Sequence, residues 1–230
     1  MTESEVRDEI CRVGRSLFER GYVHATAGNI SVALDQADGG GFLITPTDAC
    51  LGFLRPEQLA KLDADGVQVS GDRASKTMVL HRRIYTASAE TEAPARCVIH
   101  THSTHCVALT LSLPPGENQA PKELLPALTP YFVMKVGHVP LITYARPGDV
   151  VAVEHVERAI KAYHQAGTAI RAVMLDRLGP NVWHETPAAA MATLEELEET
   201  AHLWLLSGRR PEPLCNDQIE TLRQTFSARW

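Results

Sequence analysis

The stretch Cys97-Val98-Ile99-His100-Thr101-His102 decides the fold, because a short apolar run here ends in two histidines placed two residues apart. Residues two apart in a β-strand point to the same face of the sheet. Two imidazoles side by side at a strand end are able to bind one divalent metal ion. The pattern therefore predicts a strand over residues 96–102 that ends at a metal site. Taken alone, such a pair is also compatible with two polar residues at a strand terminus.

Helical and strand patterns alternate on both sides of this stretch. Apolar residues at helical spacing predict a first amphipathic helix over residues 4–20, which ends at Gly21. Asp149 is a candidate N-cap of a later helix, and Pro187 opens a long one. The remaining expected elements are helices over 75–88 and 103–112, a helix or loop around Tyr131, strands near 30–32, 42–44, 141–143 and 172–175, and a tail over 209–230 with one short helix.

These elements predict a single α/β domain over residues 1–230, with 209–230 as a C-terminal tail. Strands joined by hairpins, with helices between and after them, favour three layers, α/β/α, around a mostly antiparallel central sheet. Repeats and low-complexity linkers are absent from the sequence, so we expect no internal domain boundary.

Composition narrows the class of protein. The chain has 230 residues, of which 44% are hydrophobic and 22% are charged, and its formal net charge is −6. A mildly acidic chain has no overall attraction for nucleic acid or for an anionic membrane, and no apolar run approaches the length of a membrane span. Five widely spaced cysteines without a C-x-x-C pair indicate reduced thiols. We therefore expect a cytoplasmic protein without nucleic-acid or membrane partners.

Several loops carry groups that suit a phosphate. Gly28 allows the backbone to approach an anion closely, and Asn29 adds an amide donor. Lys76 adds a positive charge where a helix is expected to begin. Hydroxyl groups come from Thr45, Thr47 and Ser75. The competing interpretation is that Gly28-Asn29 is only a turn and Ser75 only a helix cap.

Taken together, these motifs resemble the class II aldolase/adducin family, which is typified by the fuculose-phosphate aldolases. Within that family, the chain is most similar to the 3-oxo-tetronate 4-phosphate decarboxylases. The resemblance extends over nearly the whole chain. It rests on the segments 26–31, 43–47, 70–76, 100–105, 130–131, 146–149 and 194–201.

The resemblance implies a homotetramer with active sites between subunits and a small phosphorylated sugar or sugar acid as substrate. It implies a divalent metal ion held by three histidines, usually zinc, with manganese, cobalt or iron as alternatives. The reaction it implies is carbon–carbon bond cleavage through an enediolate, by an aldolase or a decarboxylase. Tyr131 matches a tyrosine that reaches the site from the neighbouring subunit, and it is a candidate proton donor. The ordinary alternative is an aromatic residue at a subunit interface.

Three positions depart from the family pattern, and all three lie in the predicted site. Thr77 stands where the family usually has a catalytic Glu, and Leu178 stands where the third metal-binding His is expected. Asp48 replaces a glycine and brings a carboxylate next to the expected phosphate. A threonine hydroxyl is a poor base near neutral pH, and leucine cannot bind a metal ion.

Two hypotheses account for these departures. In the first, the site is re-purposed: Asp176 joins His100 and His102 as a two-His, one-carboxylate metal set, and Asp48 replaces the missing base beside Thr77. In the second, metal and catalysis are lost, and the chain serves as an anion-binding or structural module, as adducins do with this fold.

Overall fold

The computed structural model describes residues 1–111 and 123–230, and its centre is one eight-stranded sheet in the order β4-β3-β2-β1-β5-β8-β7-β6. Every neighbouring pair is antiparallel except β6 and β7, which run parallel. The predicted, mostly antiparallel sheet is confirmed. The strands are β1 Asn29–Ala33, β2 Phe42–Ile44, β3 Ala60–Leu62, β4 Gln68–Ser70, β5 Cys97–His100, β6 Leu141–Ile142, β7 Ala172–Leu175 and β8 Gly179–His184.

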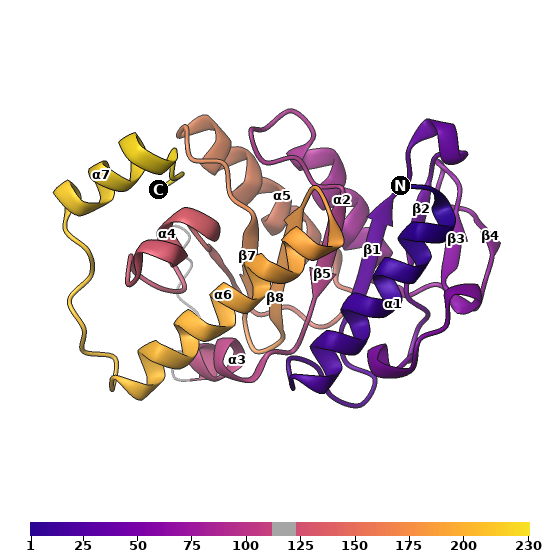
Figure 1. Cartoon of the computed structure of the whole chain (residues 1–230), viewed down its shortest axis with the longest axis horizontal. Coiled ribbons are helices and arrows are strands. Elements are labelled where there is room, and N and C mark those ends of the chain that lie inside the picture. Colours follow the sequence, from indigo (N-terminus) through magenta and orange to yellow (C-terminus); the bar gives the residue numbers. More distant parts are fainter. Residues whose placement is uncertain (112–122) are drawn as a thin grey trace.

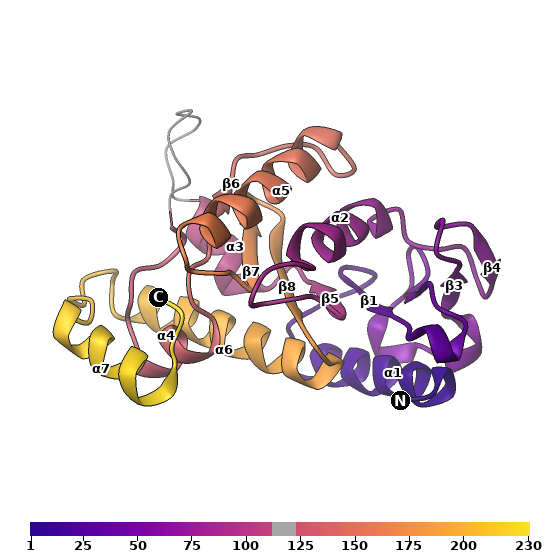
Figure 2. The same ribbon diagram turned by 90° about the horizontal axis from the view of Figure 1, so that it is seen from above.

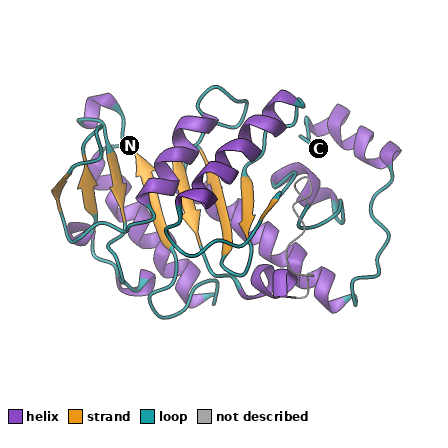
Figure 3. Ribbon diagram, turned by 180° about the vertical axis from the view of Figure 1, so that it is seen from behind, coloured by secondary structure: helices purple, strands orange, loops and turns teal. Residues whose placement is uncertain are grey.

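Helices cover both faces of the sheet, as the three-layer prediction requires. One face is covered by α1 and α6, and the other by α2 and α5, with the sheet between the two layers (Figure 2). Figure 3 shows α2 and α5 lying across the central strands, where they contact each other. The helices are α1 Glu3–Glu19, α2 Met78–Ser88, α3 Thr104–Leu111, α4 Pro130–Lys135, α5 Val150–Gln165, α6 Pro187–Leu206 and α7 Asn216–Phe226. In Figure 1, α4 and α7 lie together at the end of the molecule opposite α1.

Alternating side chains of the central strands divide between two hydrophobic clusters. Ile99 of β5 and Val182 of β8 pack with α1 and α6, whereas Val98 and Trp183 pack with α2 and α5. Trp183 is fully buried, and its indole N–H donates to the carbonyl of Ala93 at 3.1 Å. The central strands are therefore apolar on both faces, which explains the continuous apolar run before His100.

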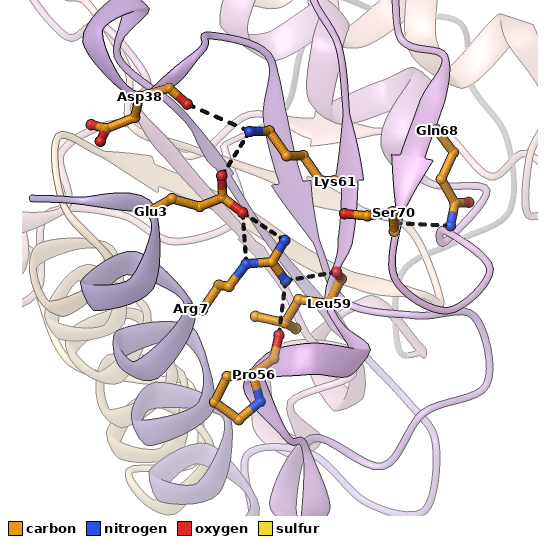
Figure 4. A network of polar contacts seen from close by, with 8 residues as sticks. All are labelled: Glu3, Arg7, Asp38, Pro56, Leu59, Lys61, Gln68 and Ser70. Atoms are coloured by element: carbon orange, nitrogen blue, oxygen red, sulfur yellow. Dashed lines mark hydrogen bonds and ion pairs between the residues drawn. The ribbon is translucent and has the colours of Figure 1, made fainter.

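A polar network holds α1 against the edge of the sheet (Figure 4). The carboxylate of Glu3 accepts hydrogen bonds from Arg7 at 2.8 Å and from Lys61 of β3 at 2.7 Å. The hydrogen bond from Lys61 contributes most to lowering the pKa of Glu3. The guanidinium of Arg7 also donates to the carbonyls of Pro56 and Leu59, at 2.8 and 2.9 Å. This network joins the first helix to the chain that leads into β3.

Most predicted elements are confirmed, with boundary corrections at two that flank the site. The helix expected from residue 75 begins at Met78, because Ser75, Lys76 and Thr77 form a turn in which the amide of Met78 donates to the carbonyl of Ser75 at 3.2 Å. The strand expected to reach residue 102 ends at His100. The expected N-cap is confirmed, since Asp149 accepts from the amide of Val151 at 3.1 Å.

Three strands were not predicted. β3 and β4 have three residues each, and all of β4 is exposed, so neither carries a clear alternating pattern. β8 contains Pro180, which lacks an amide donor and normally argues against a central strand. The register nevertheless places Pro180 opposite Met174 of β7 inside the sheet.

Gly179 opens β8 and approaches the backbone that follows β5 very closely. Its φ is +138°, and a Cβ atom built there would lie 1.9 Å from the carbonyl oxygen of Thr101. The two segments are held together by a hydrogen bond of 3.3 Å from the amide of Thr101 to the carbonyl of Pro180. A side chain at Gly179 would therefore push β8 away from the histidine pair.

We predict that Gly179→Ala lowers the free energy of unfolding by about 3 kcal/mol, from steric overlap and backbone strain combined. Urea denaturation followed by circular dichroism measures the loss. Gly148→Ala is the matched control, because Gly148 has φ +81° but a Cβ atom added to it would meet no other atom within 4 Å. The control loses about 1 kcal/mol from the backbone alone. Equal losses in the two variants would contradict the steric argument.

Candidate active site

A cavity of about 480 Å³ lies beside the histidine pair, at the ends of the central strands. It gathers most of the residues that the sequence singled out, from loops that are far apart in the chain. Its wall includes both polar loops and apolar side chains of the second hydrophobic cluster. The lining residues fall in segments 26–29, 46–48, 75–80, 143–153 and 175–181, together with His100 and His102.

The pairing of β5 with its two neighbours creates a polar row inside this cavity. His100 stands opposite Asn29 of β1 on one side and opposite Asn181 of β8 on the other. Residues directly opposite each other in antiparallel strands point to the same face. All three are buried, and the amide oxygens of Asn29 and Asn181 and the amide nitrogen of Asn181 have no hydrogen-bond partner among the described residues. Buried polar atoms left in this state favour a ligand that pairs with them.

His100 is held in one orientation. Its Nδ1 donates to the carbonyl oxygen of Pro180 at 2.9 Å, which leaves the lone pair on Nε2. Burial, and then the nearby His102, lower the pKa of His100 to about 4. The two imidazole rings lie with centroids 5.1 Å apart, and burial also lowers the pKa of His102. Neutral rings oriented through a backbone carbonyl are the form in which histidines bind metals.

The rest of a metal centre is not assembled. Over residues 1–111 and 123–230, no three His, Cys, Asp or Glu side chains come close enough to hold an ion. Asp176 lines the cavity, and one of its carboxylate oxygens is buried without a partner among the described residues. However, its amide donates to the carbonyl of Ile142 in β6 at 3.0 Å, which places Asp176 at the far side of β8 from the histidine pair. The predicted set of His100, His102 and Asp176 is therefore not brought together, and Leu178 fills part of the wall instead.

The residues predicted to bind phosphate line one cavity, with one exception. Gly28, Asn29, Thr47, Ser75 and Lys76 all line the cavity. Gly28 has φ +85°, and a Cβ atom there would lie 2.8 Å from the carbonyl oxygen of His100, so only glycine fits.

Thr45 is the exception and corrects the prediction. It is fully buried away from the cavity, and its hydroxyl accepts a hydrogen bond from the amide of Ile30 at 3.2 Å. Its role is therefore to hold the loop that follows β2 against β1.

The two replaced positions near this loop are also in the cavity. The hydroxyl of Thr77 is 2.7 Å from that of Ser75, so the two share a hydrogen bond. Asp48 lines the wall with its backbone at φ +56°, a left-handed conformation that aspartate tolerates better than most residues. Asp48 therefore lies in the cavity wall next to Thr47, and its placement beside a phosphate stays a prediction.

Tyr131 is not part of this cavity. It lies in the first turn of α4, is 62% exposed and is absent from the lining residues. Within one chain, its hydroxyl has no access to the histidine pair, so any contribution to a site needs a second copy.

Two residues of the cavity were missed by sequence reasoning. Asn181 lies in the middle of β8, and the signal that would have found it is an asparagine directly before the buried pair Val182-Trp183. Arg146 lines the opposite wall, where its guanidinium lies 3.3 Å from the carboxylate of Asp149. Segment 146–149 contributes to the family resemblance, but the resemblance gives no role to the positive charge of Arg146.

Comparisons with known proteins show the family and the fold. The family described as "Class II Aldolase and Adducin N-terminal domain" matches residues 8–205. A protein of Cupriavidus necator named 3-oxo-tetronate 4-phosphate decarboxylase is 49% identical, with 100% of this chain and 99% of that protein covered. A protein of the same name from Escherichia coli K12 is 37% identical over 91% of this chain and 90% of its own length.

Solved structures give the same picture. The crystal structure of YgbL from Escherichia coli, described as a putative aldolase/epimerase/decarboxylase, has a TM-score of 0.81 at 35% identity and covers 96% of this chain and 99% of that one. An L-fuculose 1-phosphate aldolase has a TM-score of 0.76 at 23% identity, covers 99% and 98% of the two chains, and supports the fold alone.

We predict that Leu178→His raises zinc affinity on the order of 100-fold, because a third imidazole would face the histidine pair across the cavity. Zinc content measured by mass spectrometry after dialysis against a weak chelator reports the change. Leu178→Ala is the matched control, since it opens the same space without adding a ligand. Full zinc in the unchanged chain would show that another residue, Asp176 first, completes the site. Equal and negligible zinc in all three proteins would exclude the pair as metal ligands.

Proposed function

This chain belongs to the class II aldolase and adducin family, and on that premise we propose that it is a carbon–carbon lyase acting on a small phosphorylated sugar acid. The named activity of the relatives from Cupriavidus necator and Escherichia coli favours a decarboxylase over an aldolase, with 3-oxo-tetronate 4-phosphate as the substrate. The identity extends over nearly the whole of each chain.

One observation carries the proposal. A single cavity holds phosphate-directed groups, including Ser75 and Lys76, together with buried polar atoms of Asn29 and Asn181 that have no partner among the described residues. A molecule with a phosphate at one end and a ketone and hydroxyl groups at the other would pair with both sets, because the ketone accepts from the amide nitrogen of Asn181 and the hydroxyls donate to the two amide oxygens. Pairing would also offset the cost of burying these amides, which is about 1–3 kcal/mol for each unpaired group.

The chemistry of the proposed substrate fits such a cavity. In a 3-oxo acid the ketone is β to the carboxylate, so the bond between C1 and C2 breaks with its electron pair moving toward the ketone oxygen. Carbon dioxide leaves, and the resulting enediolate takes one proton at C2 to give a three-carbon ketose phosphate. Donors preorganised at the ketone oxygen lower this barrier, and the amide of Asn181 is a buried donor in this cavity without a partner in the described chain.

The residues present hold the substrate without a complete metal centre. Class II aldolases depend on a divalent metal, and zinc is the ion we propose for this family site. The described chain offers that ion two imidazoles and no third ligand, so the steps above rest on the chain's own groups. We propose that Asp48, which lines the same cavity as Thr77, takes the place of the missing general base in proton transfer. Because a hydroxyl replaces a carboxylate at Thr77, the rate should be low.

The non-enzymatic alternative, an anion-binding or structural module, is not favoured. The relatives that cover nearly the whole chain carry enzyme names. The cavity also keeps the loops and the oriented histidine pair that an enzyme of this family would use.

We propose further that the protein is a cytoplasmic homotetramer. Exposed apolar side chains, among them Tyr131, Leu206 and Phe226, lie on α4, α6 and α7 and suit subunit contacts. The five cysteines are free, which supports a reducing compartment. Of the helices in residues 1–111 and 123–230, none combines the length and apolarity needed to cross a bilayer.

The activity is tested by measuring carbon dioxide release from 3-oxo-tetronate 4-phosphate. We expect measurable turnover, and we expect Lys76→Gln to raise KM by on the order of tenfold or more, because it removes a charge-assisted contact to the phosphate. Lys161→Gln is the matched control, since Lys161 pairs with Glu157 on the surface and should leave KM unchanged. No carbon dioxide above the spontaneous rate, from the chain and from a Thr77→Glu, Leu178→His double variant alike, would refute the lyase proposal.

The shared site is tested by mixing two defective subunits. Tyr131→Phe removes the hydroxyl that the family resemblance assigns to the neighbouring subunit's site, and Lys76→Gln weakens the phosphate contact within its own subunit's site. Co-expressed in one oligomer, the two variants regenerate some sites with both native residues, so the mixture should be more active than either variant alone. Light scattering measures the oligomeric state of each sample. A stable monomer, or a mixture no more active than the mean of its parts, would contradict an intersubunit role for Tyr131.

A further inference from the structure

A second cavity, of about 240 Å³, lies at the other end of the central strands. Arg171 directly precedes β7 and His184 ends β8, whereas the candidate active site is lined by Leu175 and Leu178, at the opposite ends of the same strands. Four residues of β7 extend over roughly 13 Å, so the two cavities are separated by the length of the strands. Residues of α4 and of the segment after α7 contribute to the wall of the second cavity, and Figure 1 shows these two parts of the chain near each other.

Basic groups dominate the polar part of this wall. Lys135, Arg171, His184 and Arg229 all line the cavity, and none of the described acidic residues does. Within residues 1–111 and 123–230, the side chains of Lys135, Arg171 and Arg229 form no hydrogen bond or ion pair. The Nη1 atom of Arg171 is buried without a partner there. A buried guanidinium nitrogen in this state is costly unless an acceptor pairs with it.

The wall carries basic side chains without an acidic side chain among the described residues to balance them. Burial, and then the charge of Arg229, lower the pKa of Arg171. Burial, and then Arg171, also lower the pKa of His184. Glu185 is the carboxylate that opposes both shifts, and it does not line the cavity. The positive groups therefore repel one another, and an anion between them would relieve that repulsion.

The remaining wall and the hydrogen-bonding state of His184 suit a small anion. Val133, Val136 and Ala169 give the cavity apolar sides, where a charge pair is screened less than in water. The Nδ1 atom of His184 accepts a hydrogen bond from the amide of Glu185 at 2.8 Å, so in the neutral ring the proton is on Nε2, which is a donor. The volume is below the range of about 300–1,000 Å³ that is typical of larger ligands.

We propose that this cavity is a second anion-binding site, separate from the candidate active site, which takes a small phosphate- or carboxylate-bearing molecule with Arg171 as its central ligand. The planar guanidinium pairs with two oxygen atoms of either group, while Lys135 and Arg229 add charge from the rim. A bound anion would connect α4, the sheet and the C-terminal segment, because each contributes a basic residue. Since α4 also carries Tyr131, occupancy would steady the helix that presents it.

Calorimetric titration of the full-length protein with inorganic phosphate tests this site. The variants are Arg171→Gln, Lys76→Gln and the double variant, with Arg15→Gln as the matched control, because Arg15 is exposed on α1 and its replacement removes the same charge elsewhere. We expect two phosphate sites in the unchanged chain, one in each single variant, and at least tenfold weaker binding at both sites in the double variant. Repeating the titration with acetate distinguishes a carboxylate site from a phosphate site.

The proposal is overturned if the double variant and the Lys76→Gln variant bind phosphate with the same stoichiometry and affinity, because Arg171 would then make no contribution to a second site. It is also overturned if Arg171→Gln changes the oligomeric state in light scattering and leaves phosphate binding intact, since the cavity would then receive a second copy of the chain. If Arg171→Gln lowers the melting temperature sharply, Arg229→Gln replaces it, because Arg229 is exposed and its loss leaves the core intact.

Discussion

The antiparallel register of β5 between β1 and β8 is the constraint on which the rest of the site depends. It sets Asn29, His100 and Asn181 opposite one another, so three buried polar groups from distant parts of the chain share one face. A slip of one residue would turn this row into the opposite hydrophobic layer. Gly28 and Gly179 protect the register from either side, because each allows a backbone approach that a side chain would block.

Local patterns were sufficient to predict the three layers and to select loops that lie with the histidine pair around one cavity, because each pattern depends on residues close in sequence. What could not be predicted depends on strand order. Asp176 is two residues from Leu178, yet β8 lies between its strand and β5, and this separates its carboxylate from the histidines. Asn181 could not be assigned to a strand from the sequence, because the preceding Pro180 lacks an amide donor and argues against a central strand. Thr45 was placed in the cavity on its residue type, although its hydroxyl is used by the backbone of Ile30.

Two residues in the loops that depart from the family pattern have left-handed backbone conformations. Asp48 and Arg177 both have positive φ, at +56° and +59°, a conformation that costs most residues about 1 kcal/mol or more. Asp48 stands where the family resemblance implies glycine, and Arg177 lies in the turn that would present the third histidine. Both loops thus adopt a backbone conformation that favours glycine, although Leu178 and Thr77 do not supply the groups that the family resemblance implies. The changes affect the chemistry of the cavity more than its form.

The apolar wall of the cavity is also the surface of a hydrophobic core. Leu80, Val153 and Leu175 line the cavity and belong to the cluster that packs α2 and α5 on the sheet. In a mutant library that varies these positions to admit a longer substrate, many variants would fail to fold, because the same side chains pack the core. Loss of folded protein would then hide any change in specificity. A change in substrate specificity should therefore arise from substitutions in the polar loops, at positions such as Asp48 and Arg146, because these leave the core packed.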